Sequence, residues 1–111
     1  MPLTAKWRSF KDSEVDLAPD ESGAYELGYR GTVVYIGSSE TSIRSRLRQH
    51  RKAKRFAKVT DFRFRKTVFH KARNLENKLC VEFVKKNGEP PHLQERMPKE
   101  AKSLARRFIY G

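Results

Sequence analysis

The chain has 111 residues, of which 37% are hydrophobic and 34% are charged, so it is long enough for one domain and too short for two. It contains 25 Lys and Arg residues against 13 Asp and Glu residues, and the formal net charge of +12 predicts a polyanionic partner. The apolar runs are too short for a membrane-spanning segment or a signal peptide. A single cysteine excludes an intramolecular disulfide framework, and the spacing of the histidines argues against a structural zinc site. We therefore expect a cytoplasmic protein.

The first elements predicted are the two arms of a hairpin. Residues 1–21 are polar with scattered apolar side chains, and we expect them to form an extension ahead of the core. Residues 24–27 and 32–36 have the composition of short strands, and the glycine-containing turn at residues 28–31 joins them. Because side chains alternate along a strand, Tyr25 is expected to point outward.

Helices dominate the rest of the chain. Apolar spacing and end signals predict a helix from Thr41 or Ser42 to about Ala53 or Phe56 and a strand over residues 60–69. They also predict a helix over residues 72–86 and a last helix over residues 98–108. We therefore predict an α+β fold, with a small three-stranded antiparallel sheet flanked by helices. The whole chain would form a single domain whose core covers about residues 22–94.

The positive charge is concentrated in residues 44–66, where eleven bases accompany a single acid. Solvated helix faces ordinarily mix both signs, so a nearly acid-free block is typical of a phosphate-contacting surface. An anionic membrane is disfavoured as the partner, because no helix pairs this block with a large apolar face. The residues expected to contact nucleic-acid phosphates are Arg44, Arg48, Arg51, Lys52, Lys54, Arg55, Arg63 and Arg65.

Two short motifs lie on the predicted hairpin. Residues 23–25 read Gly-Ala-Tyr and residues 35–37 read Tyr-Ile-Gly. Arg46 and His50 follow at i and i+4 on the next helix, so they share one helix face, and Glu76 lies on the following helix. Motifs and residues in this order resemble the GIY-YIG nuclease family, and the resemblance covers most of the chain.

The resemblance implies an endonuclease that uses Mg²⁺ or Mn²⁺ to hydrolyse DNA. It places Tyr25 and Tyr35 around the attacking water and the scissile phosphate, without deciding which tyrosine is the general base. It further assigns Arg46 to the phosphate, His50 to an outer or proton-relay position, and Glu76 to the metal as its sole protein ligand. These residue types suit the chemistry, because phosphodiester hydrolysis needs an activated water and positive charge at the phosphate.

Five further residues belong to the same motifs. Gly23 and Gly37 are expected to act as turn glycines at the ends of the two motifs. Ser38 stands where many relatives carry lysine, and Gln94 stands where the family usually carries asparagine, so the roles of both are open. Asn77 directly follows the predicted metal ligand, and its role is open as well.

A second function is compatible with the same residues. The chain could be a non-catalytic, basic nucleic-acid-binding module on the same fold. In either case phosphate contacts give affinity with little sequence information, so we expect weak sequence preference. Selectivity would then come from branched or damaged DNA structure or from a protein partner, and a monomer is favoured.

Overall fold

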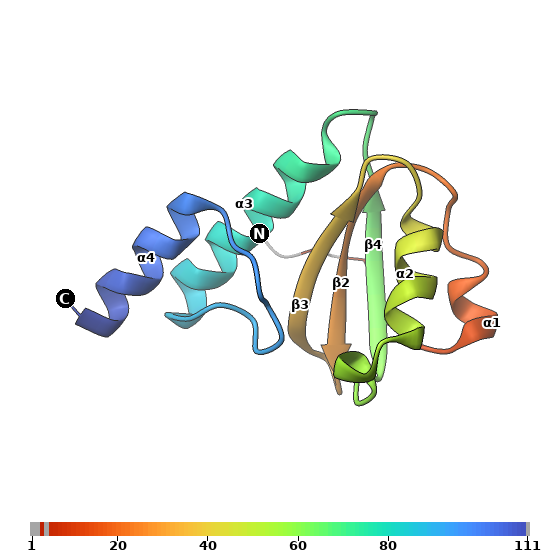
Figure 1. Ribbon diagram of the computed structural model, residues 1–111, viewed down its shortest axis with the longest axis horizontal. Coiled ribbons are helices and arrows are strands. Elements are labelled where there is room, and N and C mark those ends of the chain that lie inside the picture. Colours follow the sequence, from red (N-terminus) through yellow and green to blue (C-terminus); the bar gives the residue numbers. More distant parts are fainter. Residues whose placement is uncertain (1–2, 4, 111) are drawn as a thin grey trace.

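The structure is a computed structural model that describes residues 3 and 5–110, with side chains to residue 104. In chain order its elements are β1 (Arg8–Ser9), α1 (Asp12–Val15), β2 (Gly23–Tyr29), β3 (Thr32–Ser39), α2 (Ile43–Lys52), the 3₁₀ turn η1 (Lys54–Phe56), β4 (Asp61–Lys66), α3 (Ala72–Asn87) and α4 (Lys99–Tyr110). Figure 1 shows the sheet with α1 and α2 on one side and α3 and α4 on the other. The predicted α+β arrangement, an antiparallel sheet flanked by helices, is confirmed.

The sheet has four antiparallel strands in the order β1-β4-β2-β3, so the prediction of three strands is wrong. The additional strand, β1, is two residues long: Arg8 pairs with Phe62, and Ser9 pairs with Asp61. A strand this short carries no side-chain alternation that a sequence could reveal. Only its pairing with β4 identifies it.

The hairpin of β2 and β3 forms as predicted. Its turn places both Arg30 and Gly31 at positive φ, 49° and 84°. Positive φ at both central residues is the geometry that matches the twist of the two strands. The register shifts between Leu27 and Gly28, where the ladder is irregular. The hairpin thus brings the ends of both motifs side by side, with Tyr25 opposite Gly37.

The start of α2 and the end of α3 lie where the sequence indicates, whereas α1 lies within residues 1–21, where no helix was predicted. The hydroxyl of Ser42 accepts a hydrogen bond from the Ser45 amide and so caps α2. At its other end, α3 stops at Gly88, whose φ of 79° suits a glycine. Among the described residues, no helix is long and apolar enough to cross a membrane.

Each face of the sheet carries its own hydrophobic cluster. The cluster under α2 contains Phe10, Val15, Ala18, Tyr25, Leu27, Ile43, Leu47, Phe56, Val59 and Phe62. The cluster under α3 contains Leu3, Ala24, Ile36, Leu79, Cys80, Val81, Val84 and Ala101. Tyr25 is fully buried, so the expectation that it points outward is wrong: its face of β2 is the one that α2 covers.

Candidate active site

A pocket of about 730 Å³ lies where β3, the C-terminal half of α2 and the first turns of α3 meet. Four of the five residues predicted to be catalytic line it, and they come from three separate elements: Tyr35, Arg46, His50 and Glu76. The fifth, Tyr25, does not line the pocket but lies directly behind it. The fold therefore gathers residues that are up to 41 positions apart in the sequence (76 − 35 = 41).

Tyr25 is hydrogen-bonded to His50, the histidine of the site. Its phenol oxygen lies 2.6 Å from Nε2 of His50, and both side chains are buried. Burial, followed by the neighbouring Tyr35, raises the pKa of Tyr25 above its ordinary value. Burial also lowers the pKa of His50 to about 4, and nearby arginines add to the effect. The imidazole is therefore neutral at pH 7 and can accept a hydrogen bond from the phenol.

Tyr35 is the motif tyrosine that faces the pocket. Its ring centroid lies 6.4 Å from that of Tyr25, 5.2 Å from that of His50 and 5.0 Å from that of Phe56. The ring is thus held in an aromatic cluster while its edge remains accessible. Burial raises the pKa of Tyr35, and the negative charge of Glu76 raises it further. Its phenolate would consequently need added positive charge to form near neutral pH.

Glu76 supplies the carboxylate of the pocket. The side chain is half-buried, and the Ser38 hydroxyl donates a 2.6 Å hydrogen bond to its Oε1. Ser38 thereby fixes how the carboxylate is presented. A second acid, Glu95, also lines the pocket but is paired with Arg55 at 3.3 Å.

This donor set fits a weakly held divalent cation. Among the residues described, no group of three or more His, Cys, Asp or Glu side chains converges on one point. Mg²⁺ does not require such a cage, because it keeps several waters and commonly takes one or two carboxylates together with substrate phosphates. Glu76, oriented by Ser38 in a pocket with room for a phosphate, can act as that carboxylate.

Two arginines from the α2 region bring positive charge to the pocket. Arg46 is exposed and donates from Nη1 to Gln49 Oε1 at 2.9 Å. Arg55 lies over the rings of Phe56 and Tyr35, 4.5 and 5.6 Å from their centroids, and donates to a main-chain carbonyl of the segment that precedes α4. Guanidinium groups in this position suit a phosphate, which they can bind with paired hydrogen bonds.

Several pocket residues were absent from the sequence prediction. They are Gln49, Arg73, Glu95, Arg96 and Lys102. Helical spacing could have revealed two of them, because Gln49 follows Arg46 by three residues and Arg73 precedes Glu76 by three. The remaining three lie on or after a segment without regular structure, whose position no periodicity predicts.

The motif residues with open roles have defined contacts. The side-chain amide of Gln94 bonds to both main-chain groups of Ile36, at 2.8 and 2.9 Å, and so fastens the segment before α4 to the edge strand β3. A Cβ at Gly37 would lie 2.5 Å from the Tyr25 ring, and one at Gly23 would lie 2.4 Å from a carbonyl of β4. Both glycines therefore permit close approaches. Asn77 lines the pocket beside the carboxylate.

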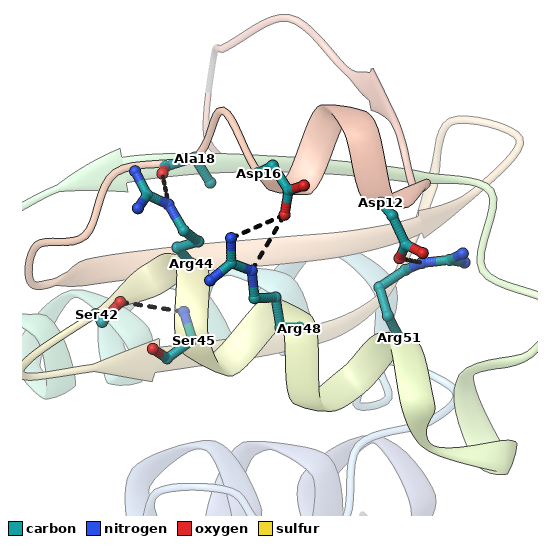
Figure 2. Close-up of polar contacts among 8 residues, drawn as sticks. All are labelled: Asp12, Asp16, Ala18, Ser42, Arg44, Ser45, Arg48 and Arg51. Atoms are coloured by element: carbon teal, nitrogen blue, oxygen red, sulfur yellow. Dashed lines mark hydrogen bonds and ion pairs between the residues drawn. The ribbon is translucent and has the colours of Figure 1, made fainter.

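Three arginines of the basic block contact α1 and the residues around it instead of lining the pocket (Figure 2). Arg48 donates twice to Asp16 Oδ1, at 3.1 and 2.9 Å, and Arg51 donates to Asp12 Oδ1 at 3.0 Å. Arg44 donates to a main-chain carbonyl just after α1, at 2.8 Å. These donors tie the N-terminal segment to α2 and are directed away from the pocket.

The two arginines of β4 differ from each other. Arg63 is mostly buried, donates to Glu26 Oε1 at 2.7 Å and lies 4.0 Å from the centroid of the Trp7 ring. Burial raises the pKa of Glu26, while Arg63 opposes the rise. Arg65, by contrast, is exposed, as are Lys52 at the end of α2 and Lys54 in η1. Of the residues predicted to contact DNA, Arg55 is the one that lines the pocket among the residues described.

The sequence matches a family model, and the fold matches solved structures. A family model described as "Domain of unknown function (DUF7508)" matches residues 1–85. No curated protein matches the sequence.

Among solved structures, the fold is similar to the GIY-YIG N-terminal endonuclease domain of UvrC from Thermotoga maritima. The magnesium-bound form of that domain is 21% identical, with a TM-score of 0.58 over 75% of this chain and 93% of that chain. Forms with an asparagine-to-alanine or a tyrosine-to-phenylalanine substitution, each bound to the catalytic divalent cation, are 22% identical with the same TM-score over 76% and 93%. The GIY-YIG fold predicted from the two motifs is confirmed.

Proposed function

The chain belongs to the DUF7508 family, whose description states no function, and we propose that it is a divalent-cation-dependent endonuclease that hydrolyses DNA phosphodiester bonds. One observation carries the proposal. A tyrosine, an arginine, a histidine and a glutamate from the hairpin, α2 and α3 converge on a single pocket, and their order in the chain is that of the GIY-YIG motifs. The GIY-YIG fold of the chain and the endonuclease activity named for its structural neighbour support the same function.

Tyr35 is the residue proposed to contact the attacking water, because it is the motif phenol that lines the pocket. Arg46 and Arg55, which both line the pocket, would orient the phosphate and offset its charge. Glu76 would hold the cation, which would supply positive charge to the phosphate when bound. Burial and Glu76 raise the pKa of Tyr35, and the charges of Arg46 and Arg55 oppose that rise and would favour its phenolate.

Tyr25 and His50 are proposed to act indirectly, by supporting the residues that contact the phosphate and the water. Their hydrogen bond, with the imidazole neutral at pH 7, fixes the orientation of both rings close to Tyr35. The pair would thus hold the pocket-facing tyrosine in position. It would not contact the phosphate through Tyr25, since that residue lies outside the pocket lining.

A nicking assay tests the proposal. Supercoiled plasmid incubated with the purified chain and Mg²⁺ or Mn²⁺ is expected to yield nicked circles, and EDTA should abolish the product. Intact, nicked and branched duplexes would be tested in parallel, because phosphate contacts alone give little sequence selectivity. Retention of DNA in a gel-shift assay without cleavage of any substrate would instead favour the non-catalytic binding module.

A further inference from the structure

The turn between β4 and α3 carries two adjacent apolar side chains in solvent. Val68 is 71% exposed and Phe69 is 60% exposed. A single exposed apolar residue needs no explanation, because much of any protein surface is apolar. Two in succession on one short turn form a small apolar tip, which is a candidate contact surface.

This turn is fastened at both ends, so the exposure of its tip is not the result of a loose loop. On the β4 side, the Thr67 amide donates to the Ser22 carbonyl at 3.0 Å, and the Ser22 hydroxyl donates to the Thr67 carbonyl at 2.7 Å. On the α3 side, the carboxylate of Glu40 accepts from the amides of His70 and Arg73, at 2.9 and 3.0 Å. His70 has a φ of 74°, a left-handed conformation that these contacts hold in place.

The surroundings of the tip are basic and adjoin the pocket. Lys66 and Lys71 flank it and are exposed, with Lys66 also 3.5 Å from the carboxylate of Glu21. Arg73, four residues after Phe69, lines the pocket. Glu40 is the acid that contacts this turn, and its carboxylate already accepts hydrogen bonds from two backbone amides of the turn. The Phe69 ring lies 3.8 Å from the His70 ring, centroid to centroid, and is 60% exposed. An exposed aromatic ring in a segment that carries lysines on both sides matches the chemistry of a nucleic-acid base joined to phosphates.

We infer that Phe69 stacks on a DNA base next to the cleavage site, and that the chain accordingly prefers DNA in which a base beside the scissile phosphate is unpaired. An intact duplex offers no open base face, because each base is already covered by its neighbours, whereas a bulged or displaced base can stack on an aromatic side chain. This inference deepens the proposed function and rests on it for the position of the scissile phosphate.

Equilibrium binding in EDTA tests the inference without cleavage. Two labelled duplexes would be compared, one fully paired and one identical except for a single unpaired base. Phe69→Ala is expected to weaken binding of the bulged duplex by about five- to a hundredfold, the range that loss of one base stack produces, and to change binding of the paired duplex by about twofold at most. Phe69→Trp should retain the preference. Leu17→Ala, at a residue 67% exposed after α1, is the matched control and should change neither affinity.

The outcomes separate the stacking inference from the proposed function. Equal effects of Phe69→Ala on the two duplexes, or no effect on either, would overturn the stacking role. A change in oligomeric state without a change in DNA affinity would also overturn it, in favour of a protein contact at the tip. If Phe69 supports the preference but wild-type chain never nicks DNA, the proposed activity fails and the stacking contact stands. If the chain nicks DNA without a Phe69-dependent preference, the stacking contact fails and the proposed activity stands.

Discussion

The phenol oxygen of Tyr25 and Nε2 of His50 lie 2.6 Å apart in the buried layer between β2 and α2. This contact joins the first motif of the hairpin to the helix that carries the arginines of the site. Because burial lowers the pKa of His50 to about 4, the contact is made by a neutral imidazole under physiological conditions. The same burial makes protonation of His50 unfavourable for the folded state.

Stability should therefore depend on the charge of His50. The unfolded chain, with an ordinary histidine pKa near 6.5, binds more protons than the folded chain between about pH 6.5 and pH 4. The free energy of unfolding should be undiminished above that window and fall by up to about 3 kcal/mol as the pH drops through it. Urea unfolding of wild type and His50→Gln measures this, and the variant should lack that part of the slope. Identical slopes would show that His50 titrates normally in the fold.

Ser38 should tune the carboxylate that we propose as the cation ligand. Its hydroxyl donates to Glu76 Oε1 at 2.6 Å, and loss of a group that orients a metal ligand typically weakens metal affinity by about tenfold or more. Ser38→Ala should raise the Mg²⁺ concentration for half-maximal nicking by about tenfold, with a smaller loss at saturating metal. Ser45→Ala, on the exposed side of α2, is the control. Unchanged metal dependence in Ser38→Ala would remove this role.

The basic block should separate into structural and DNA-binding residues. Arg48 is held by Asp16 on the protein surface, so Arg48→Ala should cost about 1 kcal/mol of stability or less and leave DNA affinity unchanged. Lys54→Ala, at an exposed residue in η1, should weaken DNA binding and reduce the slope of log affinity against log salt by about one. Fluorescence anisotropy across a salt series tests both. An equal loss of slope in Arg48→Ala would mean that this arginine leaves Asp16 for phosphate.

The buried pair of Arg63 and Glu26 should be essential to folding rather than to DNA binding. Arg63→Leu leaves the Glu26 carboxylate buried without its partner and should cost about 3–5 kcal/mol near neutral pH. The loss should shrink at pH 5, because the pKa of Glu26 is already raised by burial and a protonated, neutral side chain tolerates the site better. Arg65→Leu, two residues along the same strand and exposed, is the control. Equal stability losses in the two variants would contradict this assignment.

Local patterns predicted most of the elements, because the relevant signals lie within a few residues. The Ser42 cap, the Gly88 stop and the hairpin turn all depend on neighbours in the chain. The resemblance to the GIY-YIG family, rather than a local pattern, predicted that Tyr35 and Glu76 belong to one site, and both line the same pocket.

What the sequence did not predict depends on contacts between distant residues. Arg48 and Asp16 are 32 positions apart, and Arg63 and Glu26 are 37 apart, so charge counting along the chain could not show that these arginines are neutralised within the protein. Strand alternation predicts that Tyr25 and Ala24 lie on opposite faces of the sheet, but only the docking of α2 decides that the face of Tyr25 is buried. The two-residue strand β1 has the same origin in tertiary pairing.

The most direct measurement is DNA cleavage by a matched pair of variants, Glu76→Gln and Glu89→Gln. Both replace a carboxylate with an isosteric amide, but Glu76 lines the pocket with Tyr35 and Arg46, whereas Glu89 is exposed just beyond α3. If this pocket is the nuclease site, Glu76→Gln will abolish Mg²⁺- and Mn²⁺-dependent nicking while retaining DNA binding, and Glu89→Gln will cut at the wild-type rate. Wild-type cleavage by Glu76→Gln would contradict the account.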